Sequence, residues 1–134
     1  MKRSLPALLL PALIAILSGA ATGCADSDTG LPCEASTTGT DTVIITQALD
    51  CRSKLCMRYG ATGSTPMCTK SCAQDSDCPD ATDTCAQGFK CVHSVGVGTL
   101  KCCKMCVCRR FISGDTDPLA NSCANVSNEK CPSL

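Results

Sequence analysis

Fifteen cysteines constrain the fold of this 134-residue chain more strongly than any other feature of its sequence. Such a cysteine content in a short chain is typical of a scaffold that disulfide bonds hold together. Because fifteen is an odd number, at most seven disulfides can form within the chain, and at least one cysteine needs another use. We expect that cysteine to be Cys24, which follows an apolar segment near the amino terminus.

The amino-terminal segment has the three parts of a secretory signal peptide. Two basic residues precede an apolar run of 13 residues, Leu5–Leu17, and small residues follow up to Gly23. A membrane-spanning helix needs about 20 apolar residues, and two prolines interrupt this shorter run. We therefore predict a signal peptide over residues 1–23.

The end of this segment, Ala21–Cys24, resembles the lipobox of bacterial lipoproteins. The last three residues match, and Ala21 stands where leucine is usual. The resemblance implies cleavage before Cys24 and acylation of that cysteine, for example with palmitate, so membrane lipid is its expected partner. Two or more acyl chains make a stable anchor. The alternative is an ordinary signal peptide cleaved after Ala20, which leaves one cysteine of the secreted chain without a partner.

The cysteine pattern of the chain from Cys51 to Cys131 resembles that of Cys-rich bacterial lipoproteins. These often carry a Cys-x3-Cys-x2-Asp-x-Asp-Cys-Pro element like the one that ends at Pro79, with a Cys–Cys pair further on. Similar elements occur in extracellular Cys-rich modules of eukaryotes. Most such lipoproteins have no assigned activity, so the resemblance implies a place in the bacterial cell envelope, and Ala25 in place of Asp after the lipobox favours the outer membrane.

The composition leaves little material for a large apolar core. A mature chain over residues 24–134 has no tryptophan, one tyrosine and two phenylalanines, with ten basic and twelve acidic residues. This balance gives no reason to expect nucleic-acid binding. A chain of this kind needs disulfides for stability, and those form in an oxidising compartment. We predict a small disulfide-rich fold of mostly β structure and loops, with short hairpins and little or no helix.

We divide the mature chain into a flexible tether over residues 24–41 and a Cys-rich domain over residues 42–134. The tether is rich in Ser, Thr, Gly and Asp, although an oxidised Cys33 would pin it near that position. The β-branched residues of Thr42–Thr46 predict a first strand. Cys91–Val95 and the residues from Thr99 onward predict a hairpin around a glycine-containing turn.

We expect the fourteen cysteines other than Cys24 to form disulfides. They are Cys33, Cys51, Cys56, Cys68, Cys72, Cys78, Cys85, Cys91, Cys102, Cys103, Cys106, Cys108, Cys123 and Cys131. Fourteen cysteines allow roughly 10⁵ pairings, and the sequence does not choose among them. Adjacent cysteines do not fit the separation of a disulfide, so Cys102 and Cys103 should bond to different partners, and we expect them to join the second strand of the hairpin to two neighbours.

Metal binding is the main alternative to a purely structural use of the cysteines. Cys103, Cys106 and Cys108 have spacings found in thiolate metal sites, and His93, the only histidine, lies close in sequence. Thiolate ligands require reduced cysteine, which is uncommon in exported proteins. Cys103 and Cys106 also form a Cys-x-x-Cys motif, but no βαβ pattern surrounds it as redox chemistry of the thioredoxin kind requires. We therefore predict no metal and no cofactor.

Four aspartates between positions 75 and 83 raise the question of calcium. Asp75, Asp77, Asp80 and Asp83 lack the glycine that an EF-hand loop places at its sixth position. We interpret them as turn residues that bind backbone amides, and an irregular calcium site stays open.

No motif predicts catalysis, so we expect no enzyme activity. Inhibition of a protease is a further alternative, because the segment Met57–Met67 lies between two cysteines and could present Arg58 to a protease cleft. The favoured interpretation is a membrane-anchored envelope lipoprotein with a structural or interaction module and an unknown protein or envelope partner.

Overall fold

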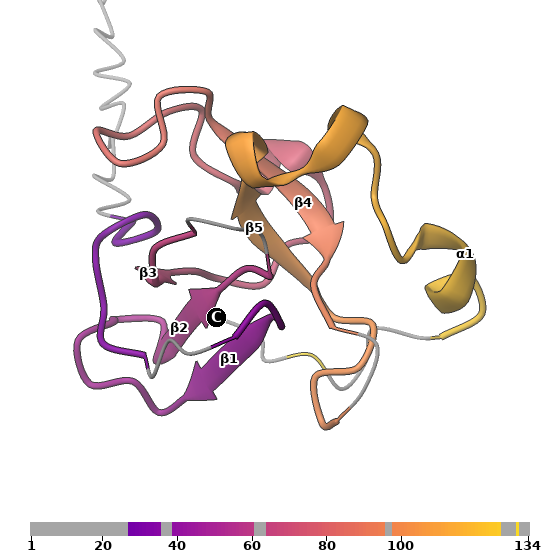
Figure 1. Cartoon of the computed structure of the whole chain (residues 1–134), viewed down its shortest axis with the longest axis horizontal. Coiled ribbons are helices and arrows are strands. Elements are labelled where there is room, and N and C mark those ends of the chain that lie inside the picture. Colours follow the sequence, from indigo (N-terminus) through magenta and orange to yellow (C-terminus); the bar gives the residue numbers. More distant parts are fainter. Residues whose placement is uncertain (1–26, 36–38, 61–63, 96–97, 127–130, 132–134) are drawn as a thin grey trace, which may run out of the picture.

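The computed structural model describes residues 27–35, 39–60, 64–95, 98–126 and 131, which form two small antiparallel sheets (Figure 1). The first sheet has the order β1-β2-β3, with strands β1 (Val43–Thr46), β2 (Leu55–Arg58) and β3 (Met67–Cys68). The second sheet pairs β4 (Phe89–His93) with β5 (Lys104–Cys108). The helical elements are the short 3₁₀ turns η1 (Asp75–Asp77), η2 (Arg109–Phe111) and η3 (Ser113–Asp115) and the helix α1 (Ala120–Cys123). The predicted fold class is confirmed.

The first sheet begins with the strand that the β-branched residues predict. β1 starts one residue later than expected and pairs with β2 in the register Val43↔Arg58 to Thr46↔Leu55. The connection between them turns back sharply, with Gln47 and Lys54 at positive φ of 69° and 59°. The amide of Ala48 donates to the carbonyl of Lys54 and closes this turn.

The second sheet is the predicted hairpin with a longer connection than expected. β4 and β5 pair over five residues, from Phe89↔Cys108 to His93↔Lys104. Cys102 and Cys103 lie in the connection before β5 rather than on the strand, because turns form at Lys101 and Cys103 and Cys102 has a φ of 61°.

The chain that leaves β3 joins the two sheets. Ser71 forms an antiparallel bridge with Met105, and the amides of Cys72 and Cys106 bond to the carbonyls of Lys104 and Lys70. The buried hydroxyl of Thr69 also donates to the carbonyl of Cys106 over 2.9 Å. β5 therefore lies between β4 and this segment, and one continuous stretch of chain holds both sheets in place.

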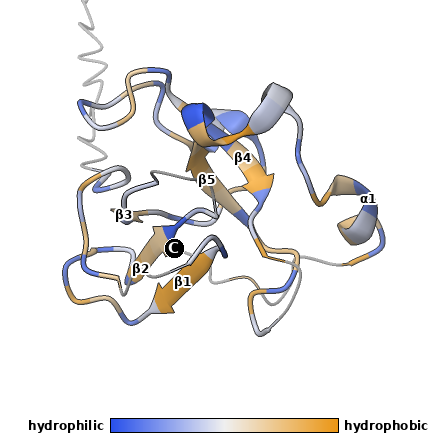
Figure 2. Ribbon diagram, in the orientation of Figure 1, coloured by the Kyte–Doolittle hydropathy of each residue, from blue (hydrophilic) through white to orange (hydrophobic). Residues whose placement is uncertain are grey.

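Along β2 and β5, apolar side chains that pack in the core alternate with cysteines that form disulfides. Leu55 and Met57 of β2 pack in one cluster with Met105 and Val107 of β5, whereas the intervening cysteines belong to other clusters. Successive side chains of a strand point to opposite faces, so the apolar faces of the two sheets meet. Figure 2 shows the apolar colouring concentrated on the strands, with more polar turns between them.

The described part of the expected tether belongs to the folded domain. The amide of Gly30 donates to the carbonyl of Cys68, Pro32 forms a bridge with Met67, and Thr29 is 1% exposed. The boundary at residue 42 is thus too late, because the Cys33–Cys56 disulfide fixes this segment to β2. The predicted signal peptide and Cys24 lie outside the described residues. Within the described part of the chain, no helix has the length and apolar character to span a membrane.

Candidate functional site

Seven disulfides pair every cysteine that the structure describes. The bonds are Cys33–Cys56, Cys51–Cys68, Cys72–Cys91, Cys78–Cys106, Cys85–Cys108, Cys102–Cys123 and Cys103–Cys131. Cys102 and Cys103 have different partners, as adjacent cysteines require, but both partners lie in the carboxyl-terminal tail rather than on two neighbouring strands. The fold is therefore stapled on both sheets and at its carboxyl-terminal end.

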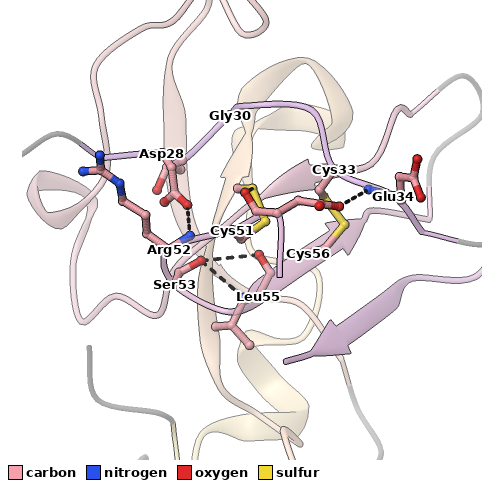
Figure 3. The surroundings of a disulfide bond; sticks show 12 residues. Asp28, Gly30, Cys33, Glu34, Cys51, Arg52, Ser53, Leu55 and Cys56 are labelled. Atoms are coloured by element: carbon pink, nitrogen blue, oxygen red, sulfur yellow. Dashed lines mark hydrogen bonds between the residues drawn. A yellow bond between two sulfur atoms is a disulfide. The ribbon is translucent and has the colours of Figure 1, made fainter. Parts of the chain in front are cut away.

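Figure 3 shows the first two disulfides where the amino-terminal segment lies beside the β1–β2 connection. The amide of Arg52 donates to the carboxylate of Asp28, and the amide of Glu34 donates to the carboxylate of Asp50 over 3.3 Å. Cys33 and Cys51 lie beside these contacts and bond to the neighbouring strands β2 and β3. Two covalent links and two side-chain bonds thus act on one small surface and make it rigid.

Two groups of three sulfur atoms are the sites where a metal could be sought. The Sγ atoms of Cys33, Cys51 and Cys68 lie within 4.8 Å of one another, and so do those of a second group, Cys72, Cys78 and Cys106. Each group consists of one whole disulfide and one sulfur of a neighbouring disulfide. Metals bind the deprotonated thiolate, so these sulfurs can serve as ligands only after reduction.

The metal set that the spacing suggested does not form. Cys103, Cys106 and Cys108 bond to three different cysteines, and Cys103 packs in another cluster than the other two. The separation arises because Cys103 precedes β5, whereas Cys106 and Cys108 lie on the face of β5 opposite that of Met105 and Val107. The Cys-x-x-Cys motif is likewise split between two structural disulfides.

Two of the four aspartates of the possible calcium site, Asp75 and Asp77, bind groups within the fold. One carboxylate oxygen of Asp75 accepts from the amide of Cys91 at 2.9 Å, and the other lies 3.5 Å from the guanidinium of Arg109. Asp77 accepts from the amides of Ala73 and Gln74, and these backbone bonds lower its pKa below the usual 3.8. Within the described residues, the groups of close metal-ligand atoms contain cysteines alone.

His93 forms a pair that sequence reasoning missed. Its Nδ1 atom lies 2.6 Å from Oδ2 of Asp117, and its amide donates to the same oxygen over 3.2 Å. The other oxygen of Asp117 accepts from the amide of Leu119. Because His93 is only 7% exposed, the pair fastens the segment after η3 to the end of β4.

Arg58 cannot be the protease anchor, so that part of the inhibitor hypothesis is wrong. The side chain is 4% exposed, and its two terminal nitrogens donate to the carbonyls of Gly39 and Asp41 over 2.6 and 2.8 Å. Met57 and Met67, the ends of the proposed loop, are buried in β2 and β3. The alternation of β2 turns Arg58 away from the core face and under the segment at positions 39–41.

A concave surface of about 380 Å³ lies between the end of β2 and the turns after β5. We call it the Tyr59 groove; its lining residues are Tyr59, Gly60, Phe111, Ile112, Ser113, Thr116 and Pro118. Burial, and then the nearby charge of Asp117, raise the pKa of Tyr59 above the usual 10.0. Two of the three aromatic residues of the chain meet here, a feature that sequence reasoning missed because the two rings are distant along the chain.

Comparison with known proteins matched no family model, no curated protein and no solved structure.

Proposed function

We propose that this chain is a lipid-anchored protein of the bacterial cell envelope, whose disulfide-stapled domain is a structural or interaction module. One observation carries the proposal. The fourteen described cysteines are all paired with one another, and therefore none of them remains as a partner for Cys24. A cysteine that ends a signal-like segment and has no disulfide partner in the domain is suited to acylation.

The oxidised domain supports an exported location. Disulfides persist in secreted and periplasmic proteins and are rare where the cytosol keeps thiols reduced. Most of these cysteines are buried, for example Cys56, Cys68 and Cys85 at 0% exposed. Thr29, five residues after Cys24, is the first buried residue in the part of the chain that the structure describes. An anchor at Cys24 would thus hold the domain close to the membrane surface, where it can meet envelope components.

The test is the intact mass of the membrane-extracted protein after alkylation without reduction. We expect a chain that begins at Cys24 with the added mass of acyl groups and no alkylated cysteine. The Cys24→Ser variant is the control and should lack acyl mass while it keeps seven disulfides. A wild-type chain that begins at Ala21 without lipid would contradict the anchor, and several alkylated cysteines in an intact chain would contradict the oxidised module.

A further inference from the structure

We propose that the Tyr59 groove binds a neutral carbohydrate, an assignment that deepens the interaction role proposed above. The groove has a volume of about 380 Å³, within the range of roughly 300–1,000 Å³ that is usual for small-molecule sites. It lies where Tyr59, which follows β2 on the same side as Leu55 and Met57, meets η2 and the segment that continues from it to Pro118.

The charge of the lining argues for a neutral ligand. None of the seven lining residues carries a charge at neutral pH, because Tyr59 is the only titratable one and the usual pKa of its phenol, 10.0, already lies well above neutrality. The charged groups beside the lining have partners within the fold. Asp117 accepts three hydrogen bonds from His93 and Leu119, and the guanidinium of Arg110 lies 4.5 Å from the centre of the ring of Phe111, itself a lining residue.

The chemistry of the lining has two parts that a sugar ring satisfies together. Tyr59, Phe111 and Pro118 provide ring surfaces, on which the apolar C–H face of a pyranose can stack. The hydroxyl-bearing residues Ser113 and Thr116 are exposed and can exchange hydrogen bonds with sugar hydroxyls. The Thr116 hydroxyl donates to the carbonyl of Ser113 over 3.4 Å and can still accept a hydrogen bond from a ligand. A purely apolar ligand would make no use of these hydroxyls, and an ionic ligand would find no charged group among the seven lining residues.

The walls of the groove are held in place before any ligand arrives. The segment that carries Phe111 to Pro118 starts after Cys108 and ends before Cys123, and both of these cysteines are in disulfides. The amide of Ile112 bonds to the carbonyl of Arg109, and Asp117 fastens the far end of the segment to β4. A preorganised site loses little entropy on binding.

The experiment uses Tyr59 as its reporter, because the chain has no tryptophan and no other tyrosine. The purified full-length protein is titrated with the neutral trisaccharides cellotriose, maltotriose and N,N′,N″-triacetylchitotriose in a detergent without a sugar headgroup. Tyrosine fluorescence and amide NMR shifts are followed to about 10 mM, which detects dissociation constants of about 1 mM. We expect at least one trisaccharide to produce a saturable change.

The variants keep Tyr59 and change one wall at a time. Phe111→Leu retains an apolar side chain but removes the ring, and it should abolish measurable binding. Thr116→Ala should weaken binding about tenfold, the scale of one lost hydrogen bond. Thr99→Ala is the matched control, because Thr99 is exposed in the β4–β5 connection and lies outside the groove; binding should be unchanged.

Two results overturn the carbohydrate assignment. They are the absence of any saturable change with the three sugars and binding that Phe111→Leu does not reduce. The mass measurement on the same preparation is independent of both. A negative sugar titration therefore does not contradict the lipid anchor. A mass that shows no lipid likewise does not affect the sugar titration.

Discussion

The Nδ1 atom of His93 lies 2.6 Å from Oδ2 of Asp117, and the two residues are 24 positions apart in the chain. Asp117 also accepts from the amides of His93 and Leu119. One carboxylate thus receives three donors and joins the end of β4 to the segment that forms a wall of the Tyr59 groove. This contact places the segment between β5 and α1 in a defined position without a disulfide of its own.

Replacement of Asp117 by alanine should therefore destabilise the domain and loosen the groove. A buried donor that loses its partner costs about 1–3 kcal/mol, and His93 loses the acceptor for both its ring and its amide. Denaturant unfolding with the disulfides intact measures the free energy. Asp50→Ala is the control, because Asp50 accepts a single exposed bond from Glu34, and its loss should cost less. Equal stability of the two variants would contradict the importance of the His93 contact.

The titration of Tyr59 is directly measurable, because it is the only tyrosine. Burial and Asp117 raise its pKa above 10.0, so the phenolate absorbance of the folded protein should appear at higher pH than in the reduced, unfolded chain. Asp117→Asn should lower the midpoint but leave it above 10.0, since burial is the larger cause. An identical midpoint in the folded and unfolded chains would refute this.

The same pKa shift predicts how stability depends on pH. A group whose folded-state pKa is raised binds its proton more tightly in the folded state, so its contribution is complete below the unfolded value of about 10 and is lost as pH rises through the folded value. The free energy of unfolding should thus fall above about pH 10. Tyr59→Phe should remove this part of the pH dependence, which denaturant unfolding at several alkaline pH values measures.

Arg58 should matter for stability and not for inhibition of a protease. Arg58→Ala removes two charge-assisted bonds to the carbonyls of Gly39 and Asp41, each worth about 1.5–3 kcal/mol in such contacts. Arg58→Lys should recover part of the loss, because a lysine keeps the charge but lacks the planar fork that reaches both carbonyls. Thermal unfolding gives the comparison. A wild-type stability in Arg58→Ala would be inconsistent with the buried contact.

Gly88 and Gly98 form a matched pair for backbone conformation. Both have positive φ, 75° and 83°, but a Cβ atom at Gly88 would lie 1.7 Å from the carbonyl oxygen of Asp80, whereas one at Gly98 meets nothing within 4 Å. Gly98→Ala should cost about 1–2 kcal/mol, the usual penalty of a left-handed residue. Gly88→Ala should cost more and reduce the yield of correctly oxidised protein, measured by unfolding and by disulfide mapping. Equal costs would contradict the close approach at Asp80.

Local patterns in the sequence determined the class of fold. The cysteine count behind a signal-like segment predicted a disulfide scaffold, and Thr42–Thr46 predicted β1 to within one residue. The alternation of apolar and cysteine residues in β2 and β5 was also present in the sequence. These features depend on neighbours along the chain, so propensity and a period of two residues are enough to detect them.

Only the tertiary structure decided which distant residues meet. The pairing of Cys33 with Cys56 and the contact of His93 with Asp117 join parts of the chain more than twenty residues apart. The position of Arg58 between two cysteines suggested that it could reach a protease cleft, yet the fold buries it beneath residues 39–41. No local pattern around Tyr59 or Phe111 predicts the Tyr59 groove. The groove forms where the end of β2 meets the turns after β5, and these two parts are distant along the chain. Contacts of this kind depend on how two small sheets pack, and local sequence patterns do not encode that packing.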